Sequence, residues 1–148
     1  MSTNHEISKI DDLITTLIDS VKGYDHSAQK VDSPDLKALF IDLATQRRAA
    51  VECLQQASRA LGGEPNDFGS AAATIHRRIE DLRVALGGGD KVIISEIERG
   101  EDYLKQEFDR VRNDDALSAA TRDVVNRAYT SVTRGHTAIS GLKHELAG

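Results

Sequence analysis

The chain has 148 residues, a net charge of −5, and a composition that is 39% hydrophobic and 29% charged. This length and balance suit one domain over residues 1–148 and exclude a disordered or a membrane-spanning chain. The acidic charge argues against nucleic acid or an anionic membrane as a partner, and a single cysteine excludes an intramolecular disulfide. The polar N-terminus lacks a signal-peptide region, so we expect a cytoplasmic protein.

Apolar residues at helical spacing predict a first helix from about Glu6 to Val31, with Gly23 inside it. Asp32 and Ser33 form a compact stop, and Pro34 suits the first position of a second helix that ends near Leu61. Such a short connection makes these two helices antiparallel.

Residues 64–89 form a long connection, in which apolar spacing predicts a shorter helix at about 70–86. This connection can run the length of the molecule, so the second and third long helices can be parallel. The three glycines at 87–89 follow no strand, so they indicate a linker and not a phosphate-binding loop.

The third long helix is predicted from Lys91 to Asn113 and the fourth from about Leu117 to Leu146, joined by a tight turn at 114–115. The apolar stripe of the third helix is interrupted by Glu101, with Glu98 one turn earlier. Antiparallel pairing places Glu98 near Thr133 and Glu101 near Thr130. Every long helix has polar residues about halfway along, and we expect Arg47 or Arg48 to pair with Glu101 in this middle layer.

Several segments resemble a ferritin-like family of small bacterial four-helix-bundle proteins known only as a domain of unknown function. They are GYDHSAQKV, DLKALF, LGGEP and SEIERGEDYLKQEF. The resemblance covers nearly the whole chain. It implies an all-α, ferritin-like four-helix bundle with a long crossover that carries a fifth, shorter helix, and it implies no particular activity.

Ferritin-like di-iron proteins use a glutamate on each of two helices and Glu-x-x-His on each of the other two. The second helix here has Gln46-Arg47-Arg48-Ala49 and lacks both ligands, and the fourth keeps His136 but has Thr133 in place of the glutamate. The candidate metal ligands that remain are Glu98, Glu101, His136 and Asp19, or Asp25 in place of Asp19. The nearby arginines oppose an intact di-iron centre, so we expect a degraded site and no bound cofactor.

The sequence contains no nucleophile–base pair or nucleotide-binding motif, so we expect no enzymatic activity. The first functional hypothesis is a non-catalytic interaction or stress-related structural module. The alternatives are a residual iron- or zinc-binding protein that uses the central Glu and His residues, and a small-ligand binder in the polar bundle centre. We also expect a homodimer, because Leu13, Ile18, Val92 and Ile93 exceed what one core needs and are predicted to face outward.

Overall fold

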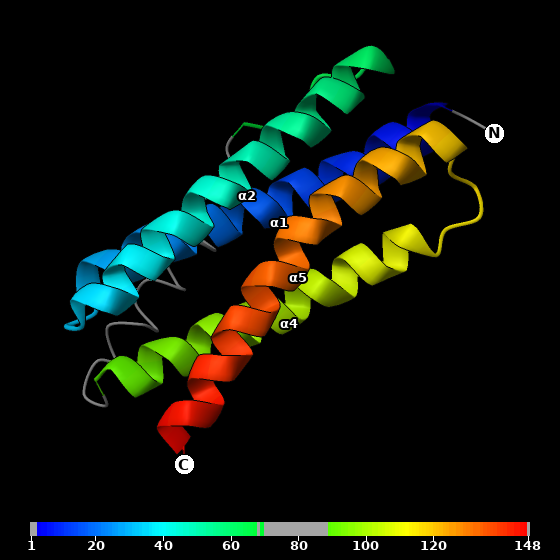
Figure 1. Ribbon diagram of the computed structural model, residues 1–148. Coiled ribbons are helices and arrows are strands. Elements are labelled where there is room, and N and C mark those ends of the chain that lie inside the picture. The colour runs from blue at the N-terminus through cyan, green and yellow to red at the C-terminus, as the bar shows by residue number, and fades with distance from the viewer. Residues whose placement is uncertain (1–2, 68, 70–88, 148) are drawn as a thin grey trace.

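Four long helices form the described part of the chain in a computed structural model, which describes residues 3–67, 69 and 89–147 (Figure 1). The helices are α1 (Thr3–Lys30), α2 (Pro34–Ala60), α4 (Asp90–Arg112) and α5 (Ala119–Ala147). These described ranges contain no strand, so the all-helical prediction is confirmed for them. The short helix predicted at about 70–86 lies outside the described residues. No described helix is long and apolar enough to cross a membrane.

The ends of the helices follow the local chemistry of the sequence. The Ser33 side chain accepts a hydrogen bond of 3.3 Å from the backbone N–H of Leu36, and Pro34 occupies the first turn of α2. The carboxylate of Asp90, at the start of α4, accepts hydrogen bonds from the backbone N–H groups of Asp32 and Ser33. These two hydrogen bonds therefore link the start of α4 to the turn between α1 and α2.

Each described helix packs against two others. Helix α1 contacts α2 and α4, and α5 contacts α2 and α4 on the other side. Helices α2 and α4 run in the same direction, while α1 and α5 run in the opposite one (Figure 1). This arrangement confirms the antiparallel first pair and the parallel second and third helices expected from the length of the connection.

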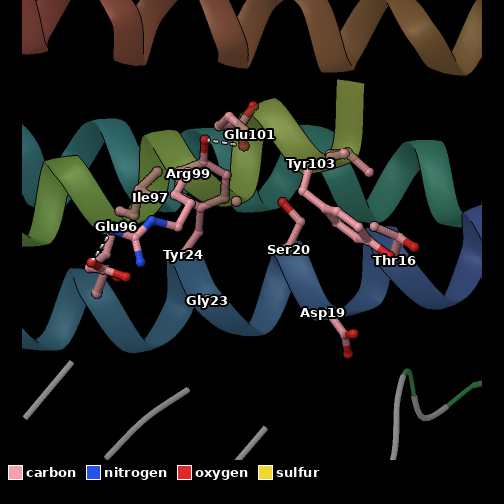
Figure 2. A pocket seen from close by; sticks show the side chains of 13 residues that line it. Thr16, Asp19, Ser20, Gly23, Tyr24, Glu96, Ile97, Arg99, Glu101 and Tyr103 are labelled. Atoms are coloured by element: carbon pink, nitrogen blue, oxygen red, sulfur yellow. Dashed lines mark hydrogen bonds and ion pairs between the residues drawn. The ribbon is translucent and has the colours of Figure 1, made fainter. Parts of the chain in front are cut away.

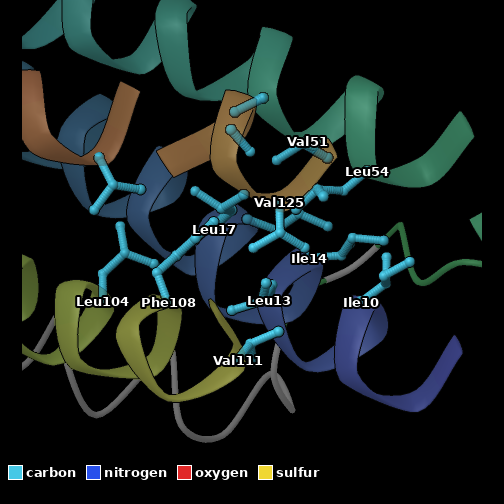
Figure 3. Packing of buried hydrophobic residues seen from close by; sticks show 14 of the residues in the cluster. Ile10, Leu13, Ile14, Leu17, Val51, Leu54, Leu104, Phe108, Val111 and Val125 are labelled. Atoms are coloured by element: carbon cyan, nitrogen blue, oxygen red, sulfur yellow. The ribbon is translucent and has the colours of Figure 1, made fainter. Parts of the chain in front are cut away.

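Among the described residues the apolar core forms two clusters, one toward each end of the helices. The larger one gathers the first half of α1, the second halves of α2 and α4, and the first half of α5 (Figure 3). The second one joins the other halves, from Tyr24 and Phe40 to Ile93 and Ile139. Burying each large aliphatic side chain contributes about 1.5–3 kcal/mol to folding before entropy is subtracted.

Three of the four residues predicted to face outward are in the core, so that prediction was wrong. Leu13, Ile18 and Ile93 have exposed fractions of 0%, 8% and 1%, and Val92 is half-buried. The physical reason is that a helix packed against two neighbours must bury a wide apolar face. Self-association remains a prediction, but it loses the support of these residues.

Candidate functional site

A cluster of polar side chains lies at the level between the two apolar clusters. Helix α1 contributes Ser20 and Tyr24, α2 contributes Arg47, and α4 contributes Glu101. These four residues are called the central cluster below. Its position halfway along the helices matches the polar middle layer predicted from the sequence.

Arg47 and Glu101 form a buried, two-pronged ion pair. The Nη1 atom of Arg47 donates to Oε1 of Glu101 at 2.8 Å, and Nη2 donates to Oε2 at 2.6 Å. The exposed fractions of the two side chains are 0% and 3%. Parallel bonds of this kind between a guanidinium and a carboxylate are short and directional. The prediction that Arg47 or Arg48 reaches Glu101 is confirmed, and the residue is Arg47.

The remaining polar atoms of the pair are engaged by neighbouring helices. Nη1 of Arg47 also donates to Oγ of Ser20 at 2.6 Å, and Nη2 approaches the carbonyl oxygen of Val132 at 3.5 Å. The hydroxyl of Tyr24 donates to Oε1 of Glu101 at 2.7 Å. The buried Nε of Arg47 has no hydrogen-bond partner in the described part of the chain. All four described helices therefore contribute contacts to the ion pair, and one donor, Nε of Arg47, is left without a hydrogen bond.

Tyr24 is a core residue whose hydroxyl is hydrogen-bonded. Its side chain is buried, and the residue is 2% exposed. Burial raises the pKa of Tyr24 well above its ordinary value of 10.0, and the negative charge of Glu101 raises it further. The phenol therefore stays protonated and acts as a hydrogen-bond donor to the carboxylate.

Gly135 on α5 provides the space that the guanidinium of Arg47 fills. A Cβ atom at this position would lie 2.2 Å from Nη2 of Arg47 and 3.1 Å from Oε2 of Glu101. Gly135 is not among the site residues predicted from the sequence. The available signal was a glycine within a long helix, next to His136 and at the level of the central arginine.

The neighbouring Arg48 has a different environment. It pairs with Asp25, and the two side chains are 52% and 43% exposed. A solvent-exposed pair of this kind contributes little to stability. The adjacent arginines of the sequence therefore separate into one buried and one surface ion pair.

The structure does not bring the four candidate metal ligands together. The Asp19 carboxylate points away from Glu101 (Figure 2) and lies close to Gly69. His136 lies 2.7 Å from a carboxylate oxygen of Asp102, and Glu98 is half-buried. Within residues 3–67, 69 and 89–147, no group of three or more His, Cys, Asp and Glu side chains could hold a metal ion.

The pairing of α4 with α5 is also shifted from the prediction. Glu101 was expected near Thr130, but its carboxylate lies beside Gly135, and its partner Arg47 reaches Val132. The residues present do not fit a di-iron centre. Both oxygens of Glu101 already accept hydrogen bonds from Arg47, and a positive guanidinium stands where a metal cation would need anionic ligands.

A cavity of about 420 Å³ lies between α1 and α4, next to the central cluster (Figure 2). Its walls include Ser20, Ser27 and Tyr24 on α1, and Ile97 and Leu104 on α4. Gly23 and Gly100 also line it, and a Cβ atom built on either would meet no protein atom within 4 Å. A glycine in a helix interior lowers stability by up to about 1 kcal/mol relative to alanine. Close packing of the two helices does not explain why glycine occupies these two positions.

Comparison with known proteins identifies the family of the chain. The family model described as "Domain of unknown function (DUF2383)" matches residues 5–114, which include Tyr24, Arg47 and Glu101 and end before α5. No curated protein matches the chain. Because the matched segment covers well over half of the 148 residues, the chain belongs to the DUF2383 family.

Proposed function

We propose that this protein is a non-catalytic structural or interaction module of the cytosol, built as a ferritin-like bundle whose central level holds an ion pair in place of metal. The observation that carries the proposal is the two-pronged contact between Arg47 and Glu101. In ferritin-like metalloproteins, inward-facing carboxylates at this level serve as ligands. Here the guanidinium of Arg47 neutralises the carboxylate of Glu101 on α4.

This contact argues against the alternative of a residual iron or zinc protein. A metal ion would have to displace Arg47 from Glu101, which would leave a buried positive charge without its partner. His136 is engaged with Asp102, and the Asp19 carboxylate points away from Glu101. A metal site made from these residues would need several side chains to move at once.

The same contacts support a role without catalysis. The Glu101 carboxylate is buried and accepts hydrogen bonds from Arg47 and Tyr24, so it is poorly placed to accept a proton from a substrate. The hydroxyl oxygen of Ser20 accepts a hydrogen bond from the positively charged Arg47, and no base that could activate it as a nucleophile is shown beside it in the described part of the chain. The central cluster is therefore suited to fixing how the four helices meet, which is the best-attested role of buried ionic groups.

Metal analysis and thermal melting of the same sample test the proposal. Protein purified without a chelator should contain far less than one metal ion per chain. A chelator or added ferrous iron should leave the melting temperature unchanged, because a metal that binds only the folded state would raise it. A fall of many degrees with chelator that iron reverses, and that Glu101→Gln abolishes, would overturn the proposal.

We also propose that the module forms a homodimer. Ile41 and Tyr103 are the large hydrophobic residues exposed on the described surface, at 52% and 50%. Two such positions are few for a stable interface, so the dimer should be weak. Light scattering at high micromolar concentration should show a mass above that of the 16.1 kDa chain, and a monomer under these conditions would contradict this part.

A further inference from the structure

We infer that the cavity between α1 and α4 binds a small, uncharged molecule with an apolar body and a hydroxyl or carbonyl group. This inference goes beyond the proposed function and does not depend on it. The volume of about 420 Å³ lies within the range of small-molecule sites, and such sites combine apolar walls with a few polar groups.

The first observation is a buried hydroxyl that lines the cavity. Ser27 is 1% exposed, and its Oγ has no hydrogen-bond partner among the residues that the structure describes. A buried polar group without a partner is costly, and nearly all such groups in proteins are satisfied by protein, water or ligand. A hydroxyl or carbonyl oxygen of a bound molecule would accept the Ser27 proton.

The second observation is the pair of glycines that face the cavity from opposite helices. Gly23 lies in α1 and Gly100 in α4, and a Cβ atom on either would meet open space. Neither glycine is needed for the two helices to approach each other. Both leave empty the volume that a ligand between the helices would occupy.

The charges around the cavity favour an uncharged ligand. Glu96 and Arg99 line the cavity and pair with each other at 3.4 Å, and Glu101 is neutralised by Arg47. The Asp19 carboxylate points away from Glu101 (Figure 2). A charged ligand would lose hydration without gaining an unpaired counter-charge in these walls.

The apolar body of the ligand would lie against α4. Ile97 and Leu104 line this wall, and the half-exposed ring of Tyr103 stands at its edge. The hydroxyl of Ser20 accepts from Arg47 and keeps its own proton to donate, so it offers a second polar anchor on α1. The site thus presents donors on α1 and hydrophobic contacts on α4.

NMR titration of the full chain with three compounds that share a phenyl ring tests this assignment. The compounds are 2-phenylethanol, ethylbenzene and phenylacetate. The backbone amide shifts of residues 16–27 and 96–104 should change saturably with 2-phenylethanol at millimolar concentration. Ethylbenzene should bind several-fold more weakly, because it leaves Ser27 unsatisfied. Phenylacetate should bind weakest, because its charge has no partner.

Glycine substitutions separate binding from stability. Gly23→Ala and Gly100→Ala should each raise the melting temperature by a few degrees and weaken 2-phenylethanol binding at least fivefold. Gly141→Ala is the matched control, because its Cβ also meets nothing within 4 Å but Gly141 does not line the cavity. It should raise the melting temperature to a similar extent and leave binding unchanged.

Ser27→Ala tests the polar anchor. It should weaken 2-phenylethanol binding several-fold and leave ethylbenzene binding unchanged. The inference is overturned if none of the three probes gives saturable shifts in these two segments. It is also overturned if the shifts persist with equal affinity in both Gly23→Ala and Gly100→Ala.

Discussion

Gly135 on α5 leaves free the space that the guanidinium of Arg47 on α2 occupies. The Cβ that any other residue would carry at position 135 would lie 2.2 Å from Nη2 of the arginine. The buried ion pair therefore depends on a glycine from a helix that contributes no side chain to it. The glycine is also outside residues 5–114, the segment matched by the family model. This relation explains how a residue as large as arginine fits between the helices with no exposure.

Gly135→Ala should lower the free energy of unfolding by about 1–3 kcal/mol, because the added methyl group forces Arg47 away from Glu101. Urea denaturation measures the change. Gly141→Ala in the same helix is the control and should be neutral or stabilising by up to about 1 kcal/mol. Equal effects of the two substitutions would show that Arg47 can move aside at no cost.

Arg47→Met should cost about 3–5 kcal/mol of stability, because it leaves the Glu101 carboxylate buried without its counter-charge. The double substitution Arg47→Met with Glu101→Leu should cost less than Arg47→Met alone, since no buried charge then remains. Denaturation curves of the two variants and of Glu101→Leu complete the cycle.

Arg48→Met is the control for this cycle, because the side chains of Arg48 and Asp25 are about half-exposed. Its cost should be no more than about 1 kcal/mol. A double variant that is as unstable as the sum of its single variants would show that the two buried residues act independently.

The positions and ends of the helices could be predicted because the apolar stripes and the capping residues are local signals. The second helix was predicted from Pro34 to Leu61 and is observed from Pro34 to Ala60, with Ser33 as its cap. Which residues face outward could not be predicted in the same way. Ile18 and Ile93 widen their stripes, and the stripe alone does not tell whether a second neighbouring helix covers the extra width.

The sequence predicted that an arginine would pair with Glu101, but it did not show which of two adjacent arginines would do so. A buried carboxylate needs a cation, and the sequence offered two adjacent arginines at the right level. The register between α4 and α5 was off by more than one turn, since Glu101 lies beside Gly135 and not Thr130. A tight turn fixes the direction of the next helix but not its rotation and shift. The roles of Gly135 and of the cavity depend on contacts between helices, and no local pattern reports those.

Acid should weaken the junction between the start of α1 and the turn before α5. A hydrogen bond from the Ser118 backbone holds the pKa of Glu6 below its ordinary 4.5, and one from the Ala116 backbone, together with His5, holds the pKa of Asp114 below 3.8. A lowered pKa in the folded state stabilises the protein above the ordinary value, and this stabilisation is lost as the pH falls through the folded value.

The free energy of unfolding should therefore decrease as the pH is lowered from about 5 to 3, where these carboxyl groups become protonated. Glu6→Gln and Asp114→Asn should each reduce stability at pH 6 and make the decrease with acid smaller. Urea denaturation across this range measures both effects. A variant that keeps the full acid dependence would show that its carboxylate does not contribute to it.

Alkali should destabilise the protein through Tyr24. Burial, and then the charge of Glu101, raise the pKa of this phenol in the folded state well above 10.0, the ordinary value that it regains on unfolding. Between the two values the folded state holds a proton that the unfolded state has lost, so the free energy of unfolding decreases as the pH rises. The slope for one such group is about 1.4 kcal/mol per pH unit.

Tyr24→Phe should remove this part of the alkaline dependence, and at neutral pH it should cost about 0.5–1.5 kcal/mol for the lost hydrogen bond to Glu101. Denaturation measured from pH 8 to 11, with absorbance at the tyrosinate band, follows both quantities. Tyr103→Phe is the control, because it removes the hydroxyl of a half-exposed ring and leaves Tyr24 in place, so the decrease should persist. An alkaline slope that is the same in Tyr24→Phe and in the unmodified protein would show that the phenol is not held protonated by the fold.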